Sequence, residues 1–360
     1  MITKPTLLLD EKKCKKNIQT MCLKFLKNKV DFRPHFKTHQ SIEIGRWFKK
    51  EGVDKIAVSS LDMALYFSEE WNDITVAFPV NILEIETINR LAKRIKLNVL
   101  VESIETVGFL NERLEDKIGF FIKIDVGYNR TGLNPNDTFS IDRILDMADS
   151  CNNLHFKGFL AHAGHTYKCK SREQVIGIHN KSVKLLTTLK AKYLKRYPDL
   201  IISSGDTPSS SIVDDFTGID EIRHGNFVFY DLTQHQIGAN KINQIAVAMA
   251  CPIVAVHKER NEIVIYGGGV HFSKESLVDE KSGTIFGRIV EIKGNSWGEI
   301  VPDVYIKNLS QEHGIVAVPD SKISDYKIGS CLLVLPIHSC MTANLMKSYK
   351  TTDSKRISRL

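Results

Sequence analysis

The chain has 360 residues, of which 42% are hydrophobic and 25% charged, values typical of a globular protein with room for a barrel and a second, smaller domain. Its 49 basic and 42 acidic residues give a formal net charge of +7, and the basic stretches alternate with apolar residues. This pattern is typical of solvated helix faces with a weak attraction for anionic substrates, and it argues against a nucleic-acid-binding protein, whose basic stripe would be denser.

The cysteines and the N-terminal residues indicate the compartment. The seven cysteines are scattered and include no C-x-x-C pair, which is typical of free thiols in a reducing environment. The first apolar run stops at Asp10, so it lacks the hydrophobic region of a signal peptide, and no stretch approaches the length of a membrane span. We therefore expect a cytoplasmic protein that does not bind membranes.

Short apolar runs alternate with amphipathic helical stretches through the first 230 residues. Eight runs are predicted strands: residues 32–37, 55–60, 73–79, 97–103, 119–127, 155–165, 200–205 and 221–230. Predicted helices between them include residues 41–50, 83–93, 104–114, 140–148 and 173–197. The apolar runs at residues 74–78 and 120–124 indicate strands buried on both faces. Eight strand–helix units predict a (β/α)8 TIM barrel, with an open, doubly wound sheet as the alternative.

The pattern changes after Tyr230, where strand-like runs follow one another without helices between them. These runs are residues 246–257, 262–266, 284–292, 314–318 and 331–336, and they predict a C-terminal all-β domain. The early run at residues 5–9 is a candidate further strand, and the polar tail from Ser348 is predicted to fray. The predicted division is a barrel of residues 11–240 and a β domain of residues 1–10 and 241–360.

Polar and titratable residues gather where the predicted barrel strands end, which is where TIM barrels carry their chemistry. Lys37 closes the first strand within the segment RPHFKTH, residues 33–39. A lysine that attacks an aldehyde must lose its proton, and burial and neighbouring cationic groups lower a lysine pKa enough to allow this. By itself such a lysine is better explained as a side chain that reaches solvent, but the surrounding cluster makes it a candidate nucleophile.

The segment at residues 203–208 follows the seventh predicted strand and combines hydroxyl groups, a glycine and a predicted helix start. This combination suits a phosphate group, and TIM barrels commonly bind phosphate after their seventh and eighth strands. Gly225 and Asn226, after the eighth strand, can add backbone N–H donors. The same residue types also form ordinary turns, so it is the position of the segment that favours a phosphate site.

His338 and Cys340 follow the last apolar run. Residues two apart in an extended segment point the same way, and an imidazole and a thiolate so placed form half of a tetrahedral zinc site that water and substrate complete. The alternative is a loop histidine beside a partly buried free cysteine.

Eight segments of the chain resemble, in order, the metal-activated D-amino-acid branch of fold-type III pyridoxal phosphate (PLP) enzymes. This branch contains eukaryotic-type D-serine dehydratases, D-threonine aldolases and 3-hydroxy-D-aspartate lyases. The segments are RPHFKTH (33–39), DVGYNRTG (125–132), HAGHTY (162–167), SSGDTPS (203–209), EIRHGNFVFYD (221–231), GGGVHFSK (267–274), QEHG (311–314) and PIHSCMTANL (336–345). His224 departs from the relatives, which often have proline or a small residue there.

The resemblance implies an alanine-racemase-type barrel plus a β domain, assembled as a homodimer, with PLP bound covalently to Lys37. It implies a further set of site residues: Tyr167 and His165 in catalysis, Arg130 near the cofactor ring, Ser204, Gly205, Thr207, Gly225 and Asn226 at the phosphate, and His338 and Cys340 on the metal.

The metal pair divides the branch. Dehydratases carry His-x-Cys and bind zinc, whereas aldolases carry His-x-Asp and use Mn²⁺ or similar ions such as Mg²⁺, in keeping with the softness of thiolate ligands. Cys340 thus favours a PLP- and zinc-dependent D-serine dehydratase, which converts a β-hydroxy D-amino acid to a 2-oxo acid and ammonia. The alternatives are a metal-dependent D-threonine or 3-hydroxy-D-aspartate aldolase, an amino-acid racemase, which would not need the metal, and a non-catalytic PLP carrier, which would lack the β domain.

Overall fold

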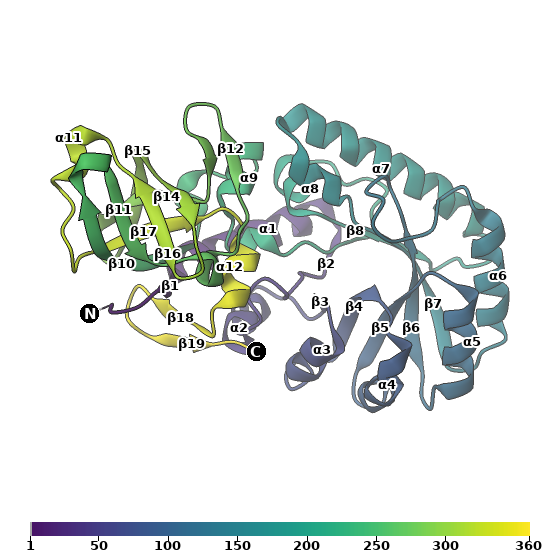
Figure 1. The fold of residues 1–360 in the computed structure, drawn as a ribbon. Helices are drawn as coiled ribbons and strands as arrows, with labels where there is room; N and C mark the ends of the chain where they lie inside the picture. Colours follow the sequence, from purple (N-terminus) through teal and green to yellow (C-terminus); the bar gives the residue numbers. More distant parts are fainter. Residues whose placement is uncertain (1) are drawn as a thin grey trace. The chain divides into compact units, whose positions relative to one another are not determined.

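Eight parallel strands form one sheet of the computed structural model, which describes residues 2–360 (Figure 1). Their order is β2-β9-β8-β7-β6-β5-β4-β3. A bridge between His35, just after β2, and Ala57 in β3 joins the two ends of this order, so the strands close into a barrel. The strands are β2 (Asp31–Phe32), β3 (Ile56–Val58), β4 (Asp73–Pro79), β5 (Lys96–Val101), β6 (Ile118–Ile124), β7 (Leu154–Ala161), β8 (Ile201–Ser204) and β9 (Glu221–Ile222).

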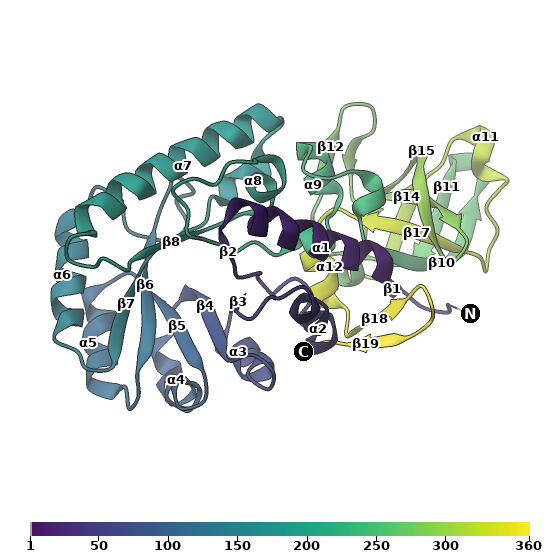
Figure 2. The same ribbon diagram turned by 180° about the vertical axis from the view of Figure 1, so that it is seen from behind.

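Helices alternate with these strands along the chain, and Figure 2 shows α5, α6 and α7 on the outer side of the sheet. The alternation confirms the predicted (β/α)8 barrel, and the closure of the sheet excludes the doubly wound alternative. The helices are α2 (Ile42–Lys50), α3 (Leu61–Phe67), α4 (Ile85–Ala92), α5 (Ile104–Arg113), α6 (Thr138–Asp149), α7 (Arg172–Tyr193) and α8 (Thr207–Ile212), with 3₁₀ turns η1 (Ile82–Glu84) and η2 (Gly164–Lys168).

Five of the barrel helices begin with a side-chain cap. In each, a Ser or Asp oxygen accepts the backbone N–H of the residue three positions on, which satisfies one of the helix's first donors. The capping residues are Ser60, Ser103, Asp137, Ser171 and Asp206. These caps fix where the loops after β3, β5, β6, β7 and β8 end, and several of the predicted site residues lie in those loops.

The first and eighth barrel strands are shorter than predicted. β2 ends at Phe32 and β9 at Ile222, whereas the apolar runs continue to residues 37 and 230. Pro34 has no backbone N–H, which interrupts the regular ladder. The pairing nevertheless continues irregularly, because the N–H of Arg33 donates to Ile222 O at 3.0 Å and that of His35 donates to His224 O at 2.9 Å.

Contacts between residues divide the chain into two units, which we describe separately. One is Gln19–Gly225, and the other combines the N-terminal residues up to Ile18 with Asn226–Leu360. Helix α1 (Glu11–Asn28) contributes to both. The predicted boundaries at residues 11 and 240 stay a proposal. Within residues 2–360, no helix is both long enough and apolar enough to cross a bilayer.

Nine strands form the main sheet of the second unit, in the order β11-β16-β15-β14-β17-β10-β1-β18-β19. Because β11 also pairs with β10, six of these strands close into a ring, and β1, β18 and β19 extend the sheet from β10. This confirms the predicted β domain. The nine strands are β1 (Thr6–Leu9), β10 (Val247–His257), β11 (Glu262–Tyr266), β14 (Gly287–Lys293), β15 (Ser296–Leu309), β16 (His313–Ala317), β17 (Cys331–Pro336), β18 (Ser348–Thr351) and β19 (Arg356–Ser358), and the unit also contains β12 (Leu277–Asp279) and β13 (Gly283–Ile285).

Short helical segments and the C-terminal residues complete this unit. The prediction that the tail frays is wrong for residues 348–358, because β18 pairs in parallel with β1 and antiparallel with β19. β12 and β13 form a separate two-stranded sheet. The helical segments are α9 (Leu232–Ile237), α10 (Gly269–Phe272), α11 (Asp320–Ile323) and α12 (Ser339–Leu345), with η3 (Asn226–Val228), η4 (Ile242–Gln244) and η5 (Lys258–Arg260).

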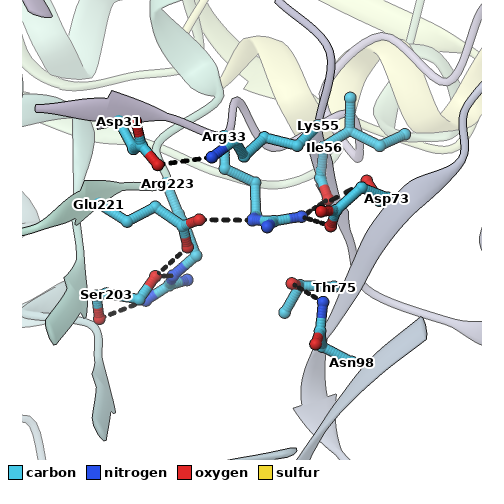
Figure 3. A network of polar contacts seen from close by, with 10 residues as sticks. All are labelled: Asp31, Arg33, Lys55, Ile56, Asp73, Thr75, Asn98, Ser203, Glu221 and Arg223. Carbon is cyan, nitrogen blue, oxygen red and sulfur yellow. Dashed lines mark hydrogen bonds and ion pairs between the residues drawn. The ribbon is translucent and has the colours of Figure 1, made fainter. Parts of the chain in front are cut away.

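Buried polar side chains form a connected network inside the barrel (Figure 3). The Nε of Arg33 donates to Glu221 at 2.7 Å, and its Nη1 donates to Asp73 at 2.6 Å. The Ser203 hydroxyl donates to the second oxygen of Glu221 and accepts from Arg223 Nε, both at 2.6 Å. Burial lowers the pKa of Arg223 to about 10, while the charge of Glu221 opposes the shift. Glu221 is therefore the acid that two buried arginines share.

Candidate active site

Lys37 lies in the turn that follows the bridge between His35 and Ala57. Its side chain is exposed, although Phe36 and Thr38 are buried. The burial expected to activate this lysine is therefore not found, because the turn presents the side chain at the rim of the barrel. Besides burial, the positive charges of Lys37 and of Arg223 lower the pKa of His35, so the imidazole near this lysine is neutral.

His162 links the lysine to the end of the seventh barrel strand. The pKa of His162 is lowered to about 3 by burial, against the hydrogen bond to Gly205, and the positive charge of Lys37 contributes to this lowering. The Nδ1 of His162 lies 3.0 Å from the carbonyl oxygen of Gly205, which follows β8. A neutral imidazole thus contacts the predicted phosphate loop.

The predicted phosphate residues after β8 carry buried hydroxyls. The side-chain oxygens of Thr207, Ser209 and Ser210 are buried and have no hydrogen-bond partner within residues 2–360. An unsatisfied buried hydroxyl costs about 1–3 kcal/mol, so three of them within four residues fit a ligand rich in oxygen acceptors. The phenolic oxygen of Tyr167 accepts the Thr207 N–H at 3.5 Å, which brings this predicted catalytic residue to the same loop.

Two glycines let the backbone pass closely behind these hydroxyls. A Cβ at Gly205, where φ is +144°, would lie 2.8 Å from Arg223 N, and a Cβ at Gly225 would lie 2.3 Å from His35 O. Real Cβ atoms do not approach so closely, so both positions require glycine. Together with the hydroxyl groups, this cradle of glycine backbone fits the phosphate of PLP, as the sequence predicts for Ser204, Gly205, Thr207 and Gly225.

Asp206, which caps α8, is a buried carboxyl group beside these hydroxyls. Burial raises its pKa from 3.8 to about 6, against the hydrogen bonds from the Ser209 backbone N–H and the Thr166 hydroxyl. Because the folded-state pKa exceeds the unfolded one, the contribution of this group to stability is complete below about pH 4 and is lost as the pH rises through about 6.

We expect Asp206→Asn, which keeps the helix cap, to gain stability relative to the wild type by up to about 3 kcal/mol between about pH 4 and pH 7. Urea unfolding of both proteins at several pH values across this range is the measurement. Two parallel stability profiles would contradict the assignment.

The loop after β6 that carries Arg130 is held by one carboxylate. Asp125 accepts the backbone N–H groups of three successive residues at 2.9–3.1 Å: Gly127, Tyr128 and Asn129. Burial lowers the pKa of His165, and the negative charge of Asp125 opposes this shift, which places the predicted catalytic histidine beside the same loop.

Tyr128 is the centre of a stack that sequence reasoning missed. The guanidinium of Arg130 lies 4.9 Å from the centre of the Tyr128 ring. The rings of His162 and His165 lie 5.9 Å and 6.2 Å from it. A Cβ at Gly164 would lie 2.4 Å from the Tyr128 ring, so only glycine leaves room for it. Tyr128 lies within the recognised segment DVGYNRTG, and the available signal was its place directly after Gly127 and two residues before Arg130.

His224, the residue that departs from the family pattern, is a core residue. Its ring lies 5.4 Å from those of Phe25 and Phe32, and burial lowers its pKa far below the usual value. The side chain therefore packs among aromatic residues, while its backbone carbonyl contributes to the pairing with β2.

His338 and Cys340 lie on either side of the first residue of α12, in the second unit. The prediction of an extended segment is half wrong: His338 has extended backbone angles, but the helix begins at Ser339 and includes Cys340. The two side chains are nevertheless linked, because Cys340 contacts Asn226, His338 contacts Asp231, and these two residues contact each other. The Nδ2 of Asn226 donates to Cys340 Sγ at 3.4 Å and to Asp231 at 2.7 Å, and Asp231 lies 3.1 Å from His338 Nδ1.

The donor set of this pair fits a metal ion. Burial lowers the pKa of His338, but the hydrogen bond to Asp231 and the nearby charge of Cys340 outweigh it and raise the pKa to about 9. A ring nitrogen and a thiolate suit zinc. Within residues 2–360, no group of three or more His, Cys, Asp or Glu side chains is arranged to hold a metal.

Two family models match the chain, one over the residues predicted to hold PLP and one over the predicted metal pair. Residues 9–232 match the model described as "Alanine racemase, N-terminal domain", which is more than half of the chain. The chain belongs to this family. Residues 246–352 match the model described as "Putative serine dehydratase domain". The alanine racemase N-terminal domain thus contains every residue predicted to hold PLP, and the second match contains the predicted metal pair; the individual roles stay predictions.

Three relatives extend the likeness of this alanine-racemase-type chain to nearly its full length. A D-serine dehydratase of Dictyostelium discoideum is 28% identical over 352 residues, which is 90% of this chain and 87% of that protein. A D-threonine aldolase of Arthrobacter sp. is 23% identical and covers 95% of this chain and 86% of its own. A mutant of D-threo-3-hydroxyaspartate dehydratase, solved in a metal-free form, superimposes with a TM-score of 0.92 at 22% identity over 100% of this chain and 98% of its own.

Proposed function

We propose that the chain is a PLP- and zinc-dependent lyase that converts D-serine, or a close β-hydroxy D-amino acid, to a 2-oxo acid and ammonia. The observation that carries the proposal is the link between His338 and Cys340 through Asp231 and Asn226, which supplies two possible metal ligands. A racemase would not need these ligands. The likeness to D-serine dehydratase over 90% of the chain supports the same substrate class.

Lys37 would hold PLP covalently, and Ser204, Thr207 and the backbone beside Gly205 and Gly225 would hold its phosphate. When bound, PLP supplies an electron sink for charge that develops at the substrate α-carbon, and zinc supplies a Lewis acid for the β-hydroxyl group. The Lys37 amine is the group that would take the α-proton. His162, kept neutral by burial, and Arg130, held against Tyr128, would fix the surroundings of that transfer.

The conversion of D-serine to pyruvate and ammonia needs no external oxidant. The substrate loses its α-proton and its β-hydroxyl as one water molecule, and the released enamine tautomerises and takes up one water as it releases ammonia. From D-serine the products are pyruvate and ammonia. The aldolase alternative would instead cleave Cα–Cβ and give glycine and an aldehyde, and Cys340 disfavours it because a thiolate is a poorer ligand than a carboxylate for the harder ions.

The test is an assay of the PLP-loaded protein with D-serine and with D-threonine, each with and without a chelator. We expect pyruvate from D-serine, its loss with the chelator, and its return on addition of Zn²⁺. Glycine and acetaldehyde as the products from D-threonine would overturn the dehydratase assignment. PLP absorption without turnover of either substrate would instead indicate a carrier protein. The homodimer and the cytoplasmic location are part of the same proposal and rest on the sequence alone.

Replacing the thiol tests the metal ligand. We expect Cys340→Ala to lose bound zinc and to lower D-serine turnover by about a hundredfold or more, because Lewis-acid catalysis contributes several kcal/mol. Zinc per protein is measured by elemental analysis after dialysis. Cys331→Ala, which removes a half-buried thiol at the start of β17 in the same unit, is the matched control and should keep both zinc and activity. Retention of zinc by Cys340→Ala would overturn the metal assignment.

A further inference from the structure

Asp231 is a fully buried carboxylate that gathers donors from three segments of the second unit. Its Oδ2 accepts from Asn226 Nδ2 at 2.7 Å, from the Ser339 backbone N–H at 3.0 Å and from the Ser339 hydroxyl at 3.3 Å, and it lies 3.1 Å from His338 Nδ1. Its Oδ1 accepts the Gln234 N–H at 2.9 Å and so caps α9. A single carboxylate therefore ties η3, α9 and the start of α12 together.

A carboxylate only accepts hydrogen bonds, so the ring nitrogen that faces it must be the one that carries hydrogen. In His338 that nitrogen is Nδ1, and the other ring nitrogen, Nε2, is then the one that can bind a metal. The thiol is also tied to this carboxylate, because Asn226 donates to Cys340 Sγ while it also donates to Asp231.

A second observation at this cluster points to a ligand. The Oδ1 of Asn226 is buried and has no hydrogen-bond partner within residues 2–360, while the Nδ2 of the same amide makes three contacts with acceptors. An unsatisfied acceptor beside an imidazole and a thiol fits a donor such as a metal-bound water.

We infer that Asp231 is a positioning residue for the metal. It accepts a hydrogen bond from His338 Nδ1, which leaves Nε2 to bind the ion, and it fixes Asn226, which in turn donates to Cys340. The inference rests on the proposed function, because it presupposes the metal on this pair. The competing explanation is that Asp231 only caps α9. The two are separable, since asparagine is as good a helix cap as aspartate but cannot accept all the donors that face Oδ2.

The experiment measures the zinc affinity of PLP-loaded Asp231→Asn by competition with a chromophoric chelator. We expect affinity to fall by about 10- to 100-fold, the usual effect of removing the hydrogen-bond partner of a metal-bound histidine. PLP absorption should stay, and activity lost at limiting zinc should return with excess zinc. After Co²⁺ substitution the thiolate charge-transfer band should persist while the ligand-field bands shift, because Cys340 still binds but the histidine is displaced. Asp137→Asn, the same replacement at the cap of α6, should leave the zinc affinity unchanged.

Asn226→Ala is the second variant, needed because a change at a buried carboxylate can impair folding. It leaves the contacts of Asp231 with His338 and Gln234 in place and removes the donor to Cys340, so zinc affinity should fall by a smaller factor and the cobalt–thiolate band should shift. Wild-type zinc affinity in both variants would overturn the inference and leave the proposed function standing. A wild-type protein that binds no zinc would overturn both.

Discussion

Replacement of Lys37 with alanine is expected to remove the visible absorption of bound PLP and to lower D-serine turnover by about a thousandfold or more. The reason is chemical: this amine is proposed both to attach PLP and to take the α-proton, and no conservative group at position 37 does both. Absorption spectra of purified protein and pyruvate formation at saturating PLP are the two measurements.

The matched control is Lys50→Ala, which removes an exposed lysine in the last turn of α2 and should change neither readout. The attachment itself is tested separately by borohydride reduction of the wild-type holoenzyme, which fixes PLP to its lysine, followed by peptide mapping. Recovery of the label on another lysine, such as the buried Lys123, would contradict the assignment of Lys37, whatever the activity of the alanine variant.

Glu221→Gln is expected to destabilise the barrel by about 3–5 kcal/mol, because it leaves buried arginine charge without its partner. Arg33 keeps its ion pair with Asp73 at 2.6 Å, but Arg223 loses the acid whose charge stabilises it. The glutamine side chain has nearly the same shape, so the loss reports on the charge rather than on packing.

The measurement is urea unfolding followed by tryptophan fluorescence in a Trp297→Phe background. The chain has three tryptophans, and Trp47 and Trp71 both lie in the Gln19–Gly225 unit, so the signal then belongs to the barrel. The control is Asp31→Asn, which breaks the exposed ion pair with Lys55 and should cost at most about 1 kcal/mol. Equal effects of the two variants would show that the network does not stabilise the barrel.

Local sequence patterns predict the parts of the fold that form between residues close together in the sequence. The run FFIKI within β6 is buried on both faces, as a central barrel strand must be, and the rhythm of strand and helix sufficed to identify the barrel. The tail beyond Ser348 was predicted to fray because its partner, β1, lies at the other end of the sequence, and no local signal marks such a pairing. The lengths of β2 and β9 were overestimated because the apolar sequence continues past Pro34, whereas the regular pairing of the two strands stops there.

In the candidate site, too, residues marked by local sequence were predicted, whereas a role that depends on a distant contact was not. The residues around Lys37, Tyr167 and Thr207 were predicted because each was placed at the end of a predicted strand. The structure puts them just beyond β2, β7 and β8, in a turn, in η2 and at the start of α8. Asp231 was missed although it lies in a recognised segment, because its partner His338 is 107 residues away and its role depends on that contact. The exposure of Lys37 agrees with the alternative weighed for this residue by itself, a side chain that reaches solvent, and not with the burial expected of a nucleophile.

The unit with the predicted metal pair is discontinuous in the sequence, and this has a consequence for biosynthesis. Strand β1 ends at Leu9, but its neighbours in the sheet begin at Val247 and Ser348, so a ribosome must add some 340 residues before the sheet can be completed. At about 5–20 residues per second this takes about half a minute. The residues of the Gln19–Gly225 unit all emerge within that interval. The residues proposed to hold the cofactor are therefore all synthesised before the N-terminal strand meets its last partner, and a nascent chain stalled before residue 330 is predicted to lack a place for the metal.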